Sequence, residues 1–265
     1  MTTAHAVRDT ATMVRRNLCH MRRYPSLTFM LILLPVVFLL LFVDVFGTTL
    51  GNGLGRMSGG RAAYANYVTP AIILLTVASA STATAISVAT DMTEGIIDRF
   101  RTMAIWRPAV LAGHVLGSTI QTTLAVVVVI AVALAVGFRP AAGALEWLAA
   151  IGVLAMITLA LTWLAVALGL VAKSVETASN SPMFLMLLPF LGSGFVPTGS
   201  MPAGLRQFAT YQPFTSFTDT LRGLLTGGAI GNHAAITVAW CAAIAIAGYV
   251  WAVARYNRGA VVAAR

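Results

Sequence analysis

Charged side chains are scarce in this chain of 265 residues. Asp, Glu, Lys and Arg make up only 9% of the sequence, hydrophobic residues make up 58%, and the mean hydropathy is +0.86. Soluble domains carry about 25% charged residues, so this chain has too few charges to cover a globular domain in water. Several apolar runs reach the ~20 residues that cross a bilayer as a helix. The sequence therefore predicts an all-α, polytopic membrane protein.

Cysteine, histidine and lysine are also rare, and none occurs in a pattern typical of a reactive site. Cys19 and Cys241 are too few and too far apart for a disulfide framework. The four histidines form no His-Glu pair at metal-ligand spacing, and the single lysine, Lys173, follows Ala172 instead of the glycine of a phosphate-binding loop. We therefore expect no enzymatic activity, metal or cofactor on this chain. If the protein is driven, its energy must come from a partner or from an ion gradient.

Arginine supplies nearly all of the positive charge, and its distribution predicts topology. The net charge is +9, yet the arginines flank apolar runs instead of covering one face, so we expect no nucleic-acid partner. With the N-terminus inside, twelve of the seventeen Lys and Arg residues fall on inner segments, as the positive-inside rule requires. We predict a multi-pass protein of a bacterial cytoplasmic (inner) membrane with both termini in the cytoplasm.

Six apolar runs are predicted to cross the bilayer as helices. They cover residues 27–46, 64–89, 114–137, 145–172, 181–195 and 234–254. The first contains Pro35, which we expect to kink it. It also contains Asp44, whose carboxylate is either functional, as intramembrane carboxylates often are, or merely solvated near the outer interface.

Two of these spans carry the residues that we expect to line a translocation path. The second is rich in small hydroxylated side chains, which suit either close helix packing or a conduit for an amphiphilic substrate. The fifth is short and interrupted by prolines and glycines, and broken helices at membrane depth are tolerated where they are buried or line a cavity. The candidate path residues are Thr76, Ser79 and Thr82 in the second span, and Met183, Met186 and Pro189 in the fifth.

The segments outside the spans include three expected helices at the membrane interfaces. Within the tail 1–25, residues 5–23 predict an amphipathic helix with arginines beside an apolar face. That face consists of Val7, Ala11, Val14, Leu18 and Met21. This pattern suits a helix lying against anionic headgroups, although a plain positive-inside anchor explains the same charges. Residues 196–233 are too polar to span and predict two short helices, 203–209 and 216–225, at the outer interface. Residues 255–265 are expected to form a cytoplasmic tail.

Charge is concentrated in residues 91–108, between the second and third spans. Six of the chain's Asp, Glu, Lys and Arg residues occur in these eighteen positions. Asp91 and Glu94 fit an N-cap and its capping-box partner, Phe100 belongs to an apolar stripe, and Pro108 is expected to end the helix. Such a helix docks on lipid or on protein. Its three acidic residues favour a protein groove, because an anionic leaflet would repel them.

Several stretches together resemble the permease subunits of ABC-2 type exporters, in particular the daunorubicin and doxorubicin resistance permeases. The most specific stretch is Asp91-Met-Thr-Glu-Gly-Ile-Ile-Asp-Arg-Phe-Arg101. The supporting stretches are Arg22-Arg-Tyr-Pro25, Phe195-Val-Pro197, Met201-Pro202, Gln212-Pro213 and Leu221-Arg222-Gly223. The chain departs from the family's usual Leu-Pro-like turn at Ile105-Trp106, which bears on where the helix ends.

This resemblance implies six transmembrane helices, an N-terminal interfacial helix, a cytoplasmic coupling helix at 91–108, and two re-entrant helices within 196–233. It implies a cassette ATPase as partner, a second permease (another copy or a paralogue), and spans two and five facing a central path. The implied docking surface for the ATPase is Asp91, Glu94, Gly95, Asp98, Arg99, Phe100 and Arg101. The resemblance implies ATP-driven export of hydrophobic drugs or lipid-like metabolites across the bilayer.

Two other functions compete with this interpretation. A polysaccharide or glycolipid exporter of the same superfamily would suit the Ser/Thr-rich second span, although the chain lacks the aromatic lining that a sugar path would favour. An ion-coupled secondary transporter would be expected to show inverted repeats and intramembrane charges. The sequence has no evident repeat and no charge pair within a span.

Overall fold

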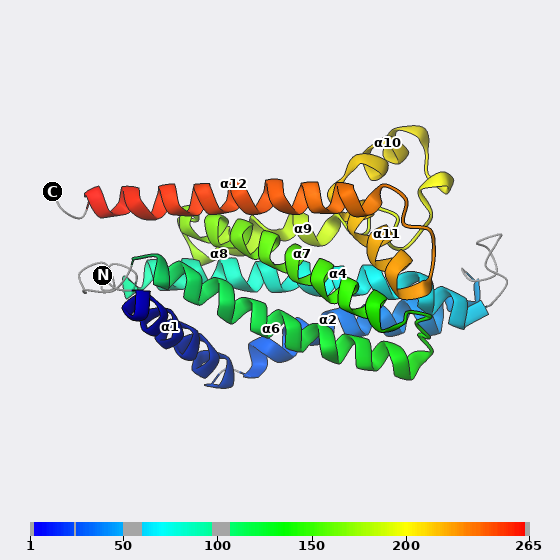
Figure 1. Ribbon diagram of the computed structural model, residues 1–265, viewed down its shortest axis with the longest axis horizontal. Helices are drawn as coiled ribbons and strands as arrows, with labels where there is room; N and C mark the ends of the chain where they lie inside the picture. The colour runs from blue at the N-terminus through cyan, green and yellow to red at the C-terminus, as the bar shows by residue number, and fades with distance from the viewer. Residues whose placement is uncertain (1–2, 24, 50–59, 97–106, 263–265) are drawn as a thin grey trace.

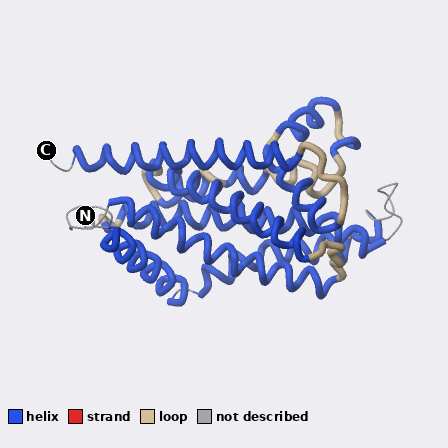
Figure 2. The backbone as a smooth tube through the Cα atoms, viewed as in Figure 1, coloured by secondary structure: helices blue, strands red, loops and turns tan. Residues whose placement is uncertain are grey.

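The computed structural model describes residues 3–23, 25–49, 60–96 and 107–262. All regular structure in these ranges is helical, which confirms the all-α prediction (Figure 2). Most helices run along the long axis of the molecule, and both termini lie at one end, where α1 (Thr3–Arg23) packs at an angle to the others (Figure 1). We call this the α1 end and the other the α11 end.

Five helical segments within the described ranges are long and apolar enough to cross a membrane. They are α2 (Pro25–Leu40) with the π-helical turn Leu41–Val45 that continues it, α4 (Gly60–Thr93), α6 (Arg107–Val136), α7 (Ala144–Val171) and α12 (His233–Val262). These segments confirm five of the six expected spans. α4, α6 and α12 extend beyond the expected limits, so that α12 includes most of the expected C-terminal tail and α6 includes residues 107 and 108.

The fifth expected span, 181–195, does not form one continuous helix. Two short helices, α8 (Val175–Asn180) and α9 (Met183–Leu187), are followed by turns through Phe195. Pro182 precedes α9, and Pro189 follows it and has no N–H to donate to the preceding turn. The prolines that predicted an interrupted span therefore break it into pieces.

α4 is the centre of the bundle. It contacts α2, α6, α7, α8, α9 and α11, and its side chains are buried almost without interruption from Tyr64 to Ser81. Its hydroxyl groups donate to carbonyls four residues earlier, which satisfies them inside an apolar environment. These bonds join Thr69 to Ala65, Thr76 to Ile72, Ser79 to Leu75, Ser81 to Val77 and Thr84 to Ala80.

The loop between the broken segment and α12 contains the two predicted short helices. α10 (Ala203–Tyr211) is largely exposed, whereas α11 (Pro213–Thr226) packs against α4, α7 and α12. α11 begins one residue after Gln212 and ends at Gly227, which adopts a left-handed conformation with φ of 74°. The existence of both helices was predictable from the three prolines that divide this region.

Replacing Gly248 by alanine should destabilise the protein, because α12 crosses α7 there with the two backbones in contact. A Cβ at this position would lie 2.7 Å from Leu164 N and 2.8 Å from Trp163 C. Overpacking of this kind costs about 1–3 kcal/mol. We expect a lower midpoint of thermal unfolding in detergent for Gly248→Ala. Gly152→Ala in α7 is the control, since nothing lies within 4 Å of its Cβ position, and an equal loss in both variants would contradict this account.

Candidate functional site

Three elements meet at the α1 end beside the charged segment: α1, the end of α4 and the beginning of α6. α1 packs directly on α6, where Asn17 Nδ2 donates to Gly113 O at 2.8 Å. A Cβ at Gly113 would lie 2.4 Å from Met13 Cβ, so glycine is what allows α1 to approach this closely. Met13 is correspondingly buried.

A charged cluster, which we call the Asp91 cluster, joins the three elements. It consists of Arg16 from α1, Asp91 from α4 and His114 from α6. Arg16 Nη2 forms an ion pair with Asp91 Oδ2. His114 Nε2 lies 3.0 Å from the same oxygen, in an orientation that does not meet hydrogen-bond geometry. Its side chain is 3% exposed, and that of Asp91 is 13% exposed. The Arg16–Asp91 pair is partly buried, so removing one partner leaves the other charge poorly compensated, and the cluster holds α1 and α6 against the end of α4.

The predicted capping box at Asp91 and Glu94 is wrong. Asp91 lies inside α4, which continues to Thr93, and Glu94 N donates to Thr90 O at 2.9 Å as the helix ends. Gly95 then adopts a left-handed conformation with φ of 68°, as is common just beyond a helix C-terminus. The local sequence predicts a helix start at Asp91, because it does not show the long-range partners Arg16 and His114.

The predicted docking residues are only partly within the described ranges. Asp91 is held in its cluster, Glu94 is exposed to solvent, and Gly95 forms the turn after α4. Asp98, Arg99, Phe100 and Arg101 lie outside the described residues, and their assignment stays a prediction. Pro108, which was expected to end a helix, lies in the first turn of α6, a position where proline is tolerated.

The six predicted path residues lie on neighbouring elements, since α4 contacts α9. Thr76 and Ser79 are buried within the bundle and Thr82 is half-buried. On the broken segment Met183 is exposed, Met186 half-buried and Pro189 buried. Their proposed role in translocation stays a prediction.

Asp44 pairs with Arg61 across the connection between the π-helical turn and α4. Both side chains are about half exposed, so the pair contributes roughly 0–1 kcal/mol to stability. This finding favours the solvated alternative for Asp44.

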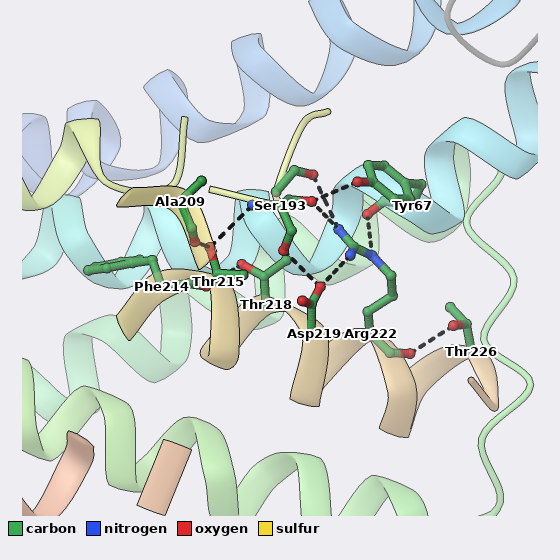
Figure 3. Close-up of polar contacts among 10 residues, drawn as sticks. Tyr67, Ser193, Ala209, Phe214, Thr215, Thr218, Asp219, Arg222 and Thr226 are labelled. Carbon is green, nitrogen blue, oxygen red and sulfur yellow. Dashed lines mark hydrogen bonds and ion pairs between the residues drawn. The ribbon is translucent and has the colours of Figure 1, made fainter. Parts of the chain in front are cut away.

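A second polar cluster lies towards the α11 end, where Arg222 binds the turns after α9 (Figure 3). We call Tyr67, Ser193, Asp219 and Arg222 the Arg222 cluster. The guanidinium donates to Asp219 Oδ1 at 2.7 Å and to Ser193 O at 2.8 Å, and its Nε donates to Tyr67 O at 3.2 Å. Its Cζ lies 3.9 Å from the centre of the Tyr67 ring, a cation–π contact.

The other members of this cluster complete its hydrogen bonding. Ser193 Oγ donates to Asp219 Oδ1 at 2.7 Å, and Tyr67 OH donates to Ser193 O at 2.8 Å. Nearby, Thr215 donates to Ala209 O and its hydroxyl also accepts from Ser193 N at 3.4 Å. The carbonyls released by the broken helix are thus satisfied by side chains of α4 and α11, as the interior of a membrane requires.

The sequence did not predict this cluster, although Arg222 belongs to one of the stretches that resemble the family. The sequence signal for this cluster is Asp219, which lies three residues before Arg222. These two residues are the only charged ones within Pro213–Thr226. Opposite charges at this spacing lie on one helix face. Their contacts with Ser193 and Tyr67 join parts of the chain that are 29 and 155 residues from Arg222, which no local pattern indicates.

Replacing Arg222 by methionine should cost roughly 2–4 kcal/mol of stability, because it leaves Asp219 without its counter-charge and removes the donor to Ser193 O. The double variant Asp219→Asn/Arg222→Met should lose less than the single one. Arg206→Met is the control: Arg206 also donates to backbone carbonyls, those of Gly199 and Met201, but is exposed. Thermal unfolding in detergent measures all three, and equal losses for Arg222→Met and Arg206→Met would contradict a special role for Arg222.

Comparison with known proteins gives a consistent result. Residues 8–226 match the family model described as ABC-2 type transporter. The chain is 30% identical over 227 residues to the daunorubicin resistance ABC transporter permease protein DrrB1 of Streptomyces coeruleorubidus. The aligned residues cover 85% of this chain and 78% of the relative. It is 23% identical over 211 residues to the probable doxorubicin resistance ABC transporter permease protein DrrC of Mycobacterium tuberculosis. That alignment covers 80% of this chain and 76% of the relative.

The family match includes most of α1, both polar clusters and the segment between α4 and α6. It also agrees with the five membrane-length helical segments of a multi-pass protein. This chain belongs to the ABC-2 type transporter family.

Proposed function

We propose that this chain is the permease subunit of an ATP-driven exporter that moves hydrophobic drugs or lipid-like metabolites outward. The observation that carries this proposal is the position of Asp91. It lies at the end of the central helix, is bound to two other helices, and directly precedes the charged residues 94–101. The names of the relatives, which are drug-resistance permeases, support the substrate class.

In this proposal the α1 end faces the cytoplasm, and a separate cassette ATPase binds residues 91–108 there. The positive-inside distribution of arginine supports this orientation. The sequence has no Gly-Lys-Ser/Thr motif of its own, so the partner supplies the nucleotide site. ATP and Mg²⁺ are bound by that partner.

α4 transmits movement of the docked segment to the opposite side of the membrane. Its 34 residues form one helix from Gly60 to Thr93, with Pro70 inside it, and a helix of that length spans about 50 Å. Near its other end, Tyr67 accepts a hydrogen bond from Arg222, which also holds the turns after α9. A displacement of Asp91 therefore reaches the broken segment through one continuous helix, in which Pro70 is the point where bending is expected.

The broken segment is the sixth crossing in this proposal, and with α4 it faces the path. Met183, Phe184 and Leu187 of α9 are exposed in the single chain, as expected for a surface that faces a second permease or an apolar substrate. Thr76, Ser79 and Thr82 complete the path from the α4 side. The helices α10 and α11 then lie at the outer interface.

Charge reversal at the docking segment should weaken ATPase binding while the permease still folds. We expect Glu94→Lys and Arg99→Glu to reduce co-purification of the cassette ATPase, and its transport-stimulated activity, by about tenfold or more, because like charges replace complementary ones across an interface. Glu146→Lys is the control, since Glu146 is exposed at the start of α7, at the other end of the bundle. Binding that is unchanged in both docking variants would refute the coupling assignment.

A further inference from the structure

The amphipathic helix α1 packs on the protein with only part of its apolar face. Met13, Asn17 and Arg16 contact α6 and α4, and they project about 80–180° from the centre of the apolar stripe, at 100° per residue. Within that stripe Val7 is 69% exposed and Ala11 is also exposed. Val14, Leu18 and Met21 are half-buried, so the described protein leaves the N-terminal part of the stripe uncovered.

A row of exposed arginines flanks this apolar stripe. Arg8, Arg15 and Arg22 recur every seven residues and fall within about 40° of one another on the helix surface, next to the apolar stripe. All three are exposed. The one carboxylate of α1, Asp9, projects about 100° from Arg8 on the side that packs on the protein, and it already has an interaction of its own.

This arrangement fits the surface of a bilayer that contains anionic lipid. Acyl chains cover the stripe of Val7 and Ala11, while headgroup phosphates accept hydrogen bonds from the adjacent arginines. Each arginine near such a surface contributes about 1 kcal/mol. The uncovered apolar stripe and the basic row lie on adjoining sides of one helix in a membrane-spanning protein, so the bilayer itself is the occupant that matches both.

Arg16 links this surface to the central helix. It projects between the basic row and the packing face of α1, and its guanidinium is paired with Asp91. α1 is fixed to the bundle by Arg16 together with the contacts of Asn17 and Met13 to α6. Any lipid that holds α1 in this position also holds Arg16 against Asp91, and the two effects are reciprocal.

We propose that α1 is a binding site for anionic phospholipid and that lipid bound there stabilises the last turn of α4 through the Arg16–Asp91 pair. The binding surface itself does not depend on the proposed function. The consequence for transport rests on it: anionic lipid would set how firmly the docking segment is joined to α4.

Lipid retention and hydrogen exchange together test this proposal without any ATPase. The permease is placed in nanodiscs of phosphatidylcholine, with or without phosphatidylglycerol. Native mass spectrometry then measures which lipid it retains, and hydrogen exchange measures the amides of Asp91, Met92 and Thr93. For the wild type we expect preferential retention of phosphatidylglycerol. We also expect exchange at these amides to slow by about fivefold in its presence, which corresponds to the contribution of one arginine at an anionic surface.

Three variants separate the two parts of the proposal. Arg8→Gln/Arg15→Gln/Arg22→Gln should reduce the retained ratio of phosphatidylglycerol to phosphatidylcholine by about tenfold or more and abolish the lipid effect on exchange. Arg16→Gln should retain phosphatidylglycerol but lose the effect on exchange. Arg255→Gln, which removes an exposed arginine of α12 towards the same end, should behave as the wild type.

Each contrary result is decisive. If the triple variant retains phosphatidylglycerol as well as Arg255→Gln does, α1 is not the lipid site. If Arg16→Gln keeps the lipid effect on exchange, the link through Asp91 is refuted. Failure of the ATPase docking assay would leave all of these measurements unaffected.

Discussion

The structure depends on the burial of a single helix, α4, whose side chains are enclosed almost without interruption from Tyr64 to Ser81. Its hydroxyls return their hydrogen bonds to the helix itself, as in the pairs Thr76–Ile72 and Ser79–Leu75. This lets a Ser/Thr-rich sequence occupy the centre of a membrane protein without unsatisfied donors. Because those groups are satisfied locally, the surrounding helices need only fit its shape.

Charged contacts occur where this helix leaves the apolar interior. Arg16 and His114 meet Asp91 at the α1 end, and Arg222 reaches the backbone of Tyr67 towards the other. Each cluster joins three separate parts of the chain, and each couples α4 to an element with a proposed role outside the bundle core. The same physical rule accounts for both: a buried charge is tolerated when its partners are fixed around it.

Composition and apolar run lengths were sufficient to predict the fold class and five of the six spans, because the bilayer imposes one length and one kind of secondary structure. Local breakers were equally informative: Pro182 and Pro189 predicted the interruption at α9 correctly. The capping-box prediction at Asp91 is wrong, because the same local sequence is compatible with a helix that begins at Asp91 and with one that continues through it. Asp91 and Arg222 could not be assigned their partners, because those partners come from distant parts of the sequence.

Neither the docking role of residues 98–101 nor the path role of Thr76, Ser79 and Thr82 has a local physical signature. Side chains on a docking surface are identified by the partner that covers them, and Ser or Thr in a membrane helix serves packing as readily as transport. Their assignment therefore rests on the family, whose match includes these positions, and on experiment.

The glycines of α7 and α12 have a mechanical consequence. A Cβ at Gly169 would lie 2.6 Å from Ala85 O of α4, and one at Gly248 would lie 2.7 Å from Leu164 N of α7. Three helices are thus in backbone contact, with no flexible side chain between them to accommodate relative tilting. These close contacts leave α4, α7 and α12 little freedom to tilt relative to one another, so we expect the three helices to move as one unit.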